Sequence, residues 1–447
     1  MSTSASHLNH ISILTKYITH EKIFFILLAI SIILFYKFNF SKIRKRIKNY
    51  IFLVATLFLF TLNFHQIVQS VARSAEDQGL VYYNWDFPQN QKINGLAVHL
   101  IQTGKRPAPV AITSNQRADF QKLIDNATPL ETSPTTFIMI LCESCWHDEN
   151  TFKEAFTPLS NKADAVLRGV SPVYGGGTPN ATFEFLTALP THHPSLSGII
   201  YQEYRDYFAT KTSTLPAHLQ SNGFRTESIH NYLGGFWFRS TVEPKLGFDR
   251  FIGIEDIDYT AVDDDYPSDT VLFGKALSVI KENQGKSKLF MHLATMYTHG
   301  PYRVRNGDGG VEYYREKLSK SVLDISKFID DVRLIDKNSV ILIYGDHKPG
   351  LPIMVHFLNE GKHLLGDVPV LLFDSNRDRA TSAKSELNGK PFYCMSSSLS
   401  RIYYGIELPA GRYTEASCRA YNGDSYEAVS RSVPDWVYSA ALFDNRL

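Results

Sequence analysis

Residues with acid–base or metal-binding side chains follow several short apolar runs of the sequence: Glu143, His230, His299, and the adjacent Asp346 and His347. A single such residue usually has only a structural hydrogen-bonding role. Four strand ends that deliver them to one edge of a parallel sheet would form a site, because ligands bind at the carboxyl ends of such strands. Carboxylates with an imidazole suit one divalent metal ion (Mn²⁺, Mg²⁺ or Zn²⁺), and the set lacks the thiolates of a structural zinc site.

A glycine-rich loop precedes a predicted helix at residues 175–180 (GGGTPN). We expect Thr178 to be the N-cap and Pro179 to take the first helical position. Glycines allow a ligand to approach the backbone, and a helix N-terminus suits a phosphate. The Thr178 hydroxyl is a poor nucleophile by itself, but coordination to a divalent metal would lower its pKa and activate it. A capped helix after a flexible loop is the simpler reading of this motif alone.

The apolar runs themselves predict the fold. Five of them alternate with longer amphipathic stretches, at residues 135–141, 224–229, 288–295, 339–344 and 368–373. This pattern is typical of buried parallel strands with helices on both faces. We therefore predict an α/β catalytic domain over residues 131–447, with a mostly parallel sheet sandwiched by helices. The polar segment 73–130 is predicted to be a linker or scaffold.

The charge of the chain is unevenly distributed. The 46 Lys and Arg residues nearly balance the 45 Asp and Glu residues, for a net charge of +1. Residues 1–72 contain eight basic residues and one acidic residue, so the remainder is acidic. That remainder would repel phosphate backbones, which argues against a nucleic-acid partner. With 44% hydrophobic residues the chain can bury a large core, which excludes intrinsic disorder.

Two apolar runs at residues 23–36 and 51–62 predict a membrane anchor with two transmembrane helices within residues 1–72. The alternative is a pair of buried core helices, but the basic run SKIRKRIK beside them favours the membrane. That run should stay in the cytoplasm, which places the catalytic domain on the extracytoplasmic face of a cell membrane. Cleavage after about Ala72 is a minority alternative.

The four cysteines are Cys142, Cys145, Cys394 and Cys418. They fit an oxidising compartment without requiring one, and they allow three pairings. The C-x-x-C at 142–145 could bind zinc or act in redox chemistry, but no second C-x-x-C completes a zinc site. We interpret all four as structural disulfide cysteines, with Cys394 and Cys418 the easiest pair to envisage.

Taken together, these motifs resemble the alkaline phosphatase and sulfatase superfamily over about residues 135–375. The resemblance is strongest to membrane phosphoglycerol transferases of the lipoteichoic acid synthase type. It rests on Glu143 after a strand, GGGT with the run Thr178–Phe185, FWFR at 236–239, THGPY at 298–302 and YGDH at 344–347. The THGP run also resembles phosphoethanolamine transferases. A sulfatase would need Cys or Ser followed by x-Pro-x-Arg, which Thr178 and its successors lack, so sulfate-ester hydrolysis is disfavoured.

The resemblance implies roles for individual residues. Glu143, Thr178, Asp346 and His347 correspond to the metal ligands, and Thr178 is also the nucleophile. Trp237 and Arg239 correspond to the substrate-binding pair, with His230 as a further substrate-site residue. His299 corresponds to a substrate-site histidine that would stabilise or protonate the leaving oxygen.

These roles imply a function at the outer face of a bacterial inner membrane. Phosphoglycerol or phosphoethanolamine would pass from a membrane phospholipid to an envelope glycan through a phospho-threonine intermediate. The alternatives are a phosphodiesterase or phosphatase, in which water is the acceptor, and a pseudoenzyme that keeps only the fold.

Overall fold

The computed structural model describes residues 50, 52–56, 58, 87–103, 109–125, 129–193, 195–260, 266–354, 366–423 and 432–443. The chain divides into two compact units, Met1–Arg106 and Pro107–Leu447. In the first unit, helix α4 (Phe87–Thr103) is kinked at Gly95. The apolar run 23–36 lies outside the described residues, and 51–62 lies inside them only in part. Within the described ranges, no helix has both the length and the apolar character needed to cross a membrane.

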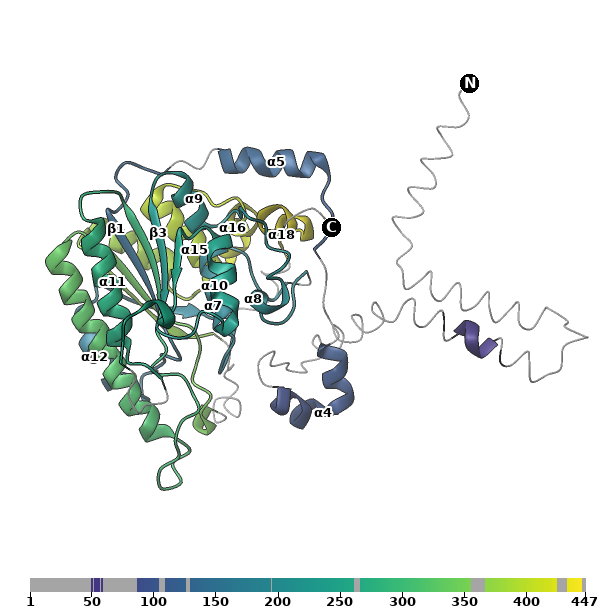
Figure 1. Cartoon of the computed structure of the whole chain (residues 1–447), viewed down its shortest axis with the longest axis horizontal. Coiled ribbons are helices and arrows are strands. Elements are labelled where there is room, and N and C mark those ends of the chain that lie inside the picture. The colour runs from purple at the N-terminus through teal and green to yellow at the C-terminus, as the bar shows by residue number, and fades with distance from the viewer. Residues whose placement is uncertain are drawn as a thin grey trace, which may run out of the picture. The chain divides into compact units, whose positions relative to one another are not determined.

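The second unit is built on a sheet of eight strands (Figure 1). In chain order the strands are β1 (Thr136–Cys142), β2 (Ala165–Val170), β3 (Arg225–His230), β4 (Arg250–Ile252), β5 (Leu289–Ala294), β6 (Val340–Gly345), β7 (Val368–Phe373) and β8 (Lys390–Pro391). Their spatial order is β4-β3-β5-β1-β6-β7-β2-β8. The five predicted strands are therefore present, and the prediction of an α/β fold with a mostly parallel sheet is confirmed.

The direction of β7 corrects one expectation. We expected its run, like the other four, to be a parallel strand, but β7 is antiparallel to both β6 and β2. All six residues of β7 are buried, as in the parallel strands β5 and β6. An apolar run reports burial on both faces and says nothing about chain direction. The strands that the sequence did not reveal are β2, whose residues alternate in burial, and the very short β4 and β8.

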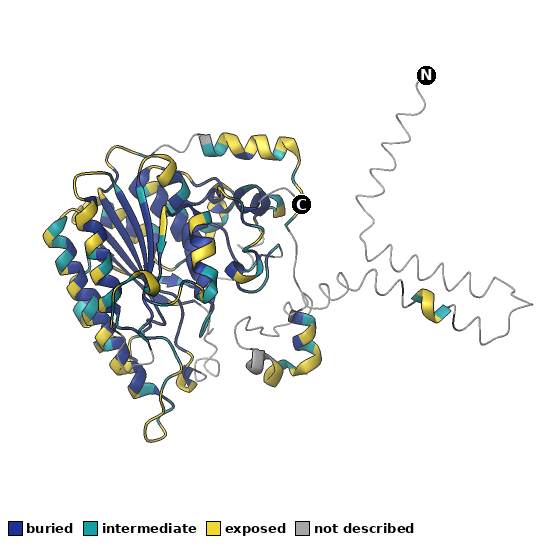
Figure 2. Cartoon of the chain, viewed as in Figure 1, coloured by how far each residue is buried: buried dark blue, intermediate teal, exposed yellow. Residues whose placement is uncertain are grey.

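Helices cover both faces of the sheet. They are α5 (Ser114–Asp125), α6 (Lys153–Ser160), α7 (Thr178–Thr187), α8 (Ile200–Glu203), α9 (Leu215–Ser221), α10 (Arg239–Val242), α11 (Asp269–Asn283), α12 (Val311–Ile335), α14 (Arg377–Leu387), α15 (Phe392–Tyr404), α16 (Gly411–Ala420) and α18 (Asp435–Leu442). Short 3₁₀ helices lie at η1 (Phe236–Phe238), η2 (Glu243–Leu246), η3 (Ile254–Asp256) and η4 (Pro352–Met354). Helices α11 and α12 pack together with α6 against α12, while α15 packs on α7 and α14. Figure 2 shows the buried strands between these helical layers.

The register of the central strands determines where the site forms. Leu141 near the end of β1 pairs with Ala294 of β5 on one side and with Tyr344 of β6 on the other. The three parallel strands therefore end at nearly the same level. The residues that follow them, starting with Glu143 and Asp346, are brought to one edge of the sheet.

Candidate active site

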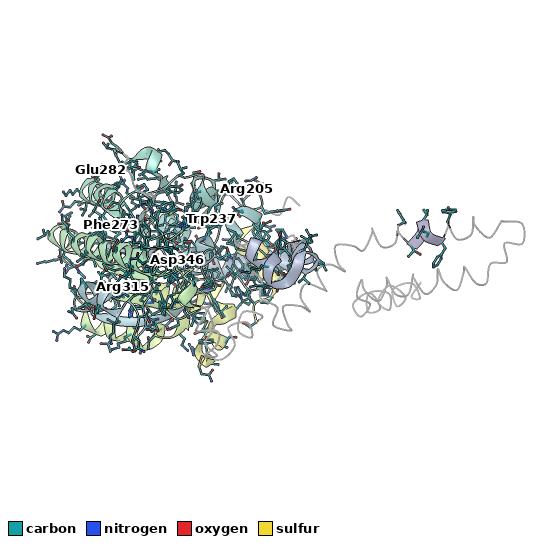
Figure 3. The ribbon with its side chains drawn as sticks, turned by 90° about the horizontal axis from the view of Figure 1, so that it is seen from below. Arg205, Trp237, Phe273, Glu282, Arg315 and Asp346 are labelled. Carbon is teal, nitrogen blue, oxygen red and sulfur yellow. A yellow bond between two sulfur atoms is a disulfide. The ribbon has the colours of Figure 1, made fainter. Side chains whose placement is uncertain are left out.

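Three of the predicted metal ligands meet at this edge. Side-chain atoms of Glu143, Asp346 and His347 lie within 4.8 Å of one another, and all three residues are buried. Nε2 of His347 lies 3.4 Å from Oε1 of Glu143 and 3.3 Å from Oδ2 of Asp346. Figure 3 labels Asp346 within the body of the second unit.

Backbone contacts hold the two carboxylates in place. The Ser144 amide donates a 2.7 Å hydrogen bond to Oδ1 of Asp346, and the His347 amide donates to the same oxygen at 3.0 Å. The Ser144 hydroxyl donates to Oε1 of Glu143 at 2.9 Å. One carboxylate oxygen of Asp346 is thus fixed by amides, while its other oxygen remains turned toward His347.

Thr178 reaches this cluster from the start of helix α7. Its hydroxyl donates a hydrogen bond of 3.1 Å to Oε2 of Glu143, and its side chain is buried. The helix begins at Thr178 itself, with Gly177 as the N-cap, so our placement of Thr178 as the cap was wrong by one residue. Gly177 has a φ of 83°, a left-handed conformation that glycine adopts without strain. The Gly175 amide donates to the Lys348 carbonyl at 3.1 Å, which ties this loop to the segment that carries Asp346.

Burial and mutual charge shift the pKa values of the cluster in different directions. Burial raises the pKa of Asp346 to about 7, with a further contribution from the Glu143 charge. Burial opposes protonation of His347, but the charge of Asp346 and the contact with Glu143 raise its pKa to about 9. Burial would also raise the pKa of Glu143, but the close contact with His347 and its charge bring it well below its ordinary value. The metal-free cluster therefore gains stability by holding a proton on His347.

These residues fit a divalent cation. Oδ2 of Asp346 and Nε2 of His347 are buried and have no hydrogen-bond partner among the described residues. Nδ1 of His347 lies 2.9 Å from the Lys348 carbonyl, and donation of its proton to that oxygen leaves Nε2 with a free lone pair. Two carboxylates, an imidazole and a nearby hydroxyl form a donor set that suits Mn²⁺, Mg²⁺ or Zn²⁺.

His230 and Arg239 occupy a second polar region next to the cluster. Nδ1 of His230 lies 2.9 Å from the Ala294 carbonyl, while its Nε2 is buried without a hydrogen-bond partner in the described part of the chain. Burial and the charge of Arg239 lower the pKa of His230 to about 3, so its ring is neutral. Arg239 is buried and pairs with Glu243.

His299 lies on the loop after β5, and Trp237 lies in the 3₁₀ helix η1, where Phe236 contacts both rings. His299 is half-buried, and its ring meets those of Phe236 and Tyr266 edge-on at 6.1 and 5.0 Å. The Thr298 hydroxyl donates to the Glu143 carbonyl, which joins the His299 loop to the cluster. Trp237 is half-buried with a φ of 56°, and Figure 3 labels it. Direct contacts among the described residues join Glu143, Thr178, Asp346 and His347, and the charge of Arg239 acts on His230.

Several residues that support the site were not singled out from the sequence. Ser144 donates to the carboxylates of Glu143 and Asp346. Ser171 and Tyr314 bind the backbone of the ligand-bearing segments, since the Ser171 hydroxyl donates to the Asp346 carbonyl and the Tyr314 hydroxyl to the Ser144 carbonyl. Asp269 accepts bonds from Asn231, Ser321 and the two backbone amides after β5. Of these residues, only Ser144 could have been suspected from the sequence, because it directly follows the predicted ligand Glu143.

The predicted disulfides are also confirmed. Cys142 pairs with Cys145, and Cys394 pairs with Cys418. The first bond therefore encloses Glu143, and the second joins α15 to α16.

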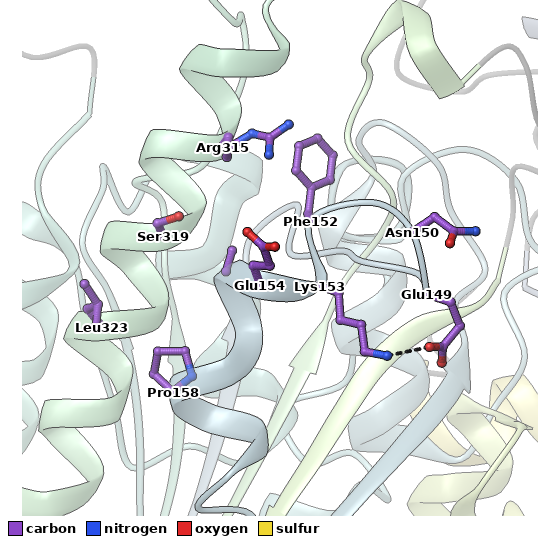
Figure 4. A pocket seen from close by; sticks show the side chains of 10 residues that line it. Glu149, Asn150, Phe152, Lys153, Glu154, Pro158, Arg315, Ser319 and Leu323 are labelled. Carbon is purple, nitrogen blue, oxygen red and sulfur yellow. Dashed lines mark hydrogen bonds and ion pairs between the residues drawn. The ribbon is translucent and has the colours of Figure 1, made fainter.

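A cavity of about 460 Å³ lies between α6 and α12, where Figure 4 shows Phe152, Lys153 and Arg315 at its wall. None of the predicted site residues lines it. The Lys153–Glu149 ion pair crosses one side of this cavity.

Comparison with known proteins decides the family. The sulfatase family model matches residues 135–385, which is more than half of the chain. The chain belongs to the sulfatase family. The superfamily that the motifs resembled is therefore confirmed, and the matched residues contain all of the predicted site.

Several individual proteins contain segments similar to this chain. A Rhizobium meliloti protein, provisionally named a cyclic beta-1,2-glucan modification protein, is 24% identical over 292 residues, or 60% of this chain and 44% of that protein. Lipoteichoic acid synthase of Staphylococcus aureus is 29% identical over 183 residues, or 37% of this chain and 27% of the synthase. The chain thus spans less than half the length of these relatives. The structure of the Streptococcus pyogenes phosphoglycerol transferase GacH has the same fold, with 19% identity, a TM-score of 0.50, and coverage of 76% of this chain and 96% of GacH.

Proposed function

We propose that this member of the sulfatase family transfers a phospho-alcohol headgroup from a membrane phospholipid to an envelope glycan through a covalent intermediate on Thr178. The headgroup is phosphoglycerol or phosphoethanolamine. The observation that carries the proposal is the position of the Thr178 hydroxyl, 3.1 Å from a carboxylate oxygen of Glu143 inside a buried carboxylate and histidine cluster. The named phosphotransferases among its relatives support the type of reaction.

In the first step, the Thr178 hydroxyl releases its proton to solvent, its oxygen attacks phosphorus, and the bond between phosphorus and the diacylglycerol oxygen breaks. Glu143 accepts the hydroxyl hydrogen bond, which orients the oxygen toward the entering phosphate. His299 would donate a proton to the departing diacylglycerol oxygen. The positively charged Arg239 would donate hydrogen bonds to the phosphate oxygens, while the neutral His230, whose Nδ1 faces the Ala294 carbonyl, would offer Nε2 as an acceptor to a substrate hydroxyl.

A divalent metal held by Glu143, Asp346, His347 and Thr178 would supply charge neutralisation and a lower pKa for the Thr178 hydroxyl. In the second step, an acceptor hydroxyl of the glycan gives its proton to His299 and attacks phosphorus, and the Thr178 oxygen leaves and regains a proton from solvent. This step restores the threonine and completes the transfer.

We further propose that residues 131–447 form the catalytic domain outside the membrane, that residues 73–130 are a linker, and that residues 1–72 anchor the chain. The basic charge of residues 1–72 and their two apolar runs support this topology. The two disulfides are consistent with an oxidising compartment.

The test follows both halves of a labelled donor. The full-length protein is incubated in vesicles with phosphatidylglycerol or phosphatidylethanolamine labelled in the headgroup, with and without envelope glycan. Transfer predicts diacylglycerol release and label on the glycan. Free headgroup phosphate released at the full rate without glycan would show that the protein is a hydrolase. Absence of diacylglycerol with every donor would refute catalysis on phospholipids.

A further inference from the structure

The turn that carries Glu143 is closed by a disulfide that the proposed reaction does not use. Cys142 and Cys145 stand on either side of Glu143 and Ser144, and both cysteines are fully buried. The Cys145 amide donates a 3.1 Å hydrogen bond to the Cys142 carbonyl, so the turn is closed by a backbone bond as well as by the covalent one.

Ser144 inside this turn has an unfavourable backbone conformation. Its φ of 52° lies in the left-handed region, which residues other than glycine rarely adopt. In this conformation its amide donates the 2.7 Å hydrogen bond to Oδ1 of Asp346. The Tyr314 hydroxyl donates to the Ser144 carbonyl at 2.6 Å from the other side. The amide and hydroxyl of Ser144 therefore point at the carboxylates of Asp346 and Glu143. Other contacts must restrain the backbone of the turn in this left-handed conformation.

The same turn is packed against the strand that precedes the other ligands. Cys142 pairs in register with Gly345, the residue directly before Asp346. A Cβ atom at Gly345 would lie 2.1 Å from the Cys145 carbonyl oxygen, so only glycine permits this approach. The end of β1, directly before Glu143, therefore packs tightly against the end of β6, directly before Asp346.

We propose that the Cys142–Cys145 disulfide is a positioning device for the divalent metal site. It holds the Glu143 carboxylate and the Ser144 amide against the mutual repulsion of the buried Glu143 and Asp346 side chains. Without the bond, the turn relaxes from the left-handed Ser144 conformation and the two carboxylates separate. Binding of the metal must then restore the arrangement, and affinity falls. This inference rests on the metal centre of the proposed function.

The test measures metal affinity directly. Full-length protein stripped with a chelator is titrated calorimetrically with Mn²⁺ and, in parallel, with Zn²⁺. We expect Cys142→Ala/Cys145→Ala to weaken binding about 10- to 100-fold, the range for loss of a group that orients a metal ligand. The matched control is Cys394→Ala/Cys418→Ala, which removes the disulfide between α15 and α16 and should leave the affinity unchanged.

Melting temperatures separate positioning from general stability. The control bond links residues 24 apart and the site bond residues 3 apart, so the control variant should lose more stability. An unchanged affinity in Cys142→Ala/Cys145→Ala, or an equal loss in both double variants, would overturn the inference. If the double alanine variant does not fold, Cys142→Ser/Cys145→Ser removes the same bond with side chains closer in size to cysteine; weaker binding there supports the inference, and unchanged binding overturns it. Wild-type protein that binds neither metal would instead contradict the proposed metal centre itself.

Discussion

Arg239 and Glu243 form an ion pair inside the protein, with Nη1 of Arg239 donating to Oε1 of Glu243 over 3.0 Å and side chains only 2% and 0% exposed. The Tyr201 hydroxyl donates to the same carboxylate oxygen at 3.3 Å. The guanidinium is therefore fixed on one side, while its buried Nε has no hydrogen-bond partner among the residues that the structure describes. Glu243 thus positions the cation that we assign to the substrate phosphate.

Glu243→Gln should impair both stability and donor binding. Removal of one charge from a buried pair leaves the other uncompensated, which costs about 3–5 kcal/mol of unfolding free energy. The guanidinium also loses its orientation, so KM for the phospholipid should rise more than kcat falls. Denaturant unfolding and steady-state kinetics measure the two effects.

The control is Glu415→Gln, because Glu415 and Arg419 form an ion pair with the same spacing but on the surface. An exposed pair contributes at most about 1 kcal/mol, so this variant should behave like wild type. Equal effects of the two substitutions would show that burial of the Arg239 pair has no special role.

Metal-free protein should become less stable as the pH rises from about 7 to about 9, above the range in which the other buried histidines would be protonated in the unfolded state. The pKa of Asp346 is raised to about 7 and that of His347 to about 9, both above their unfolded values. The folded state therefore binds more protons than the unfolded state in this window, and that stability is lost as pH rises through the folded pKa values. Thermal melts of chelator-treated protein across this range measure the slope.

Asp346→Asn should flatten that slope, because the Asp346 charge is also what raises the pKa of His347. Asp378→Asn, at an exposed position of α14, should leave it unchanged. A wild-type slope retained in Asp346→Asn would assign the pH dependence to other groups.

Asp269 joins the end of β3, which carries His230, to the loop that carries His299. It is fully buried and accepts hydrogen bonds from Asn231, which follows His230, and from the Met296 and Tyr297 amides, which precede His299. Asp269→Asn replaces one carboxylate oxygen with an NH₂ group, which cannot accept a hydrogen bond, and removes the negative charge that the Met296 and Tyr297 amides face. Since hydrogen bonds to charged groups contribute about 1.5–3 kcal/mol each, we expect a loss of that order in unfolding free energy and a lower kcat/KM.

Ser321→Ala offers a graded comparison, because Ser321 donates only one bond, of 2.6 Å, to Asp269 from helix α12. It should cost less stability and leave the two histidine-bearing segments, and therefore kcat/KM, nearly intact. Equal activity losses in the two variants would contradict the role assigned to Asp269.

The sequence predicted the parts of the site that depend on strand ends. Apolar runs located β1, β3, β5 and β6 to within about one or two residues, and the residues after β1 and β6 meet as the parallel arrangement requires. The direction of β7 was missed because an apolar run does not report chain direction, and the strands β2, β4 and β8 were missed because none of them is a continuous apolar run.

The supporting contacts could not be predicted because they join residues far apart in the chain. Ser144 and Asp346 are 202 positions apart, and Tyr314 is 170 positions from Ser144. Arg239 and Glu243 are close enough to be read as a helical pair, but sequence spacing does not reveal whether such a pair is buried. Because the pair is buried, loss of one partner is expected to lower the free energy of unfolding far more than in an exposed pair.

The proposed covalent role of Thr178 has a matched control in the same helix. Thr187 is also buried in α7, but its hydroxyl donates to the Phe183 carbonyl and does not contact the metal-site cluster. Thr187→Ala should therefore keep activity, whereas Thr178→Ala should abolish turnover while the fold and metal content persist. Substantial residual activity in Thr178→Ala would remove its assignment as nucleophile.

The most direct test is mass spectrometry of the full-length protein after incubation with headgroup-labelled phosphatidylglycerol or phosphatidylethanolamine and without glycan acceptor. We predict a labelled phospho-alcohol adduct on the peptide that contains Thr178, present in wild type and Thr187→Ala, absent in Thr178→Ala, and discharged when glycan is added. Diacylglycerol release without any adduct on Thr178, or the same adduct in Thr178→Ala, would contradict the account.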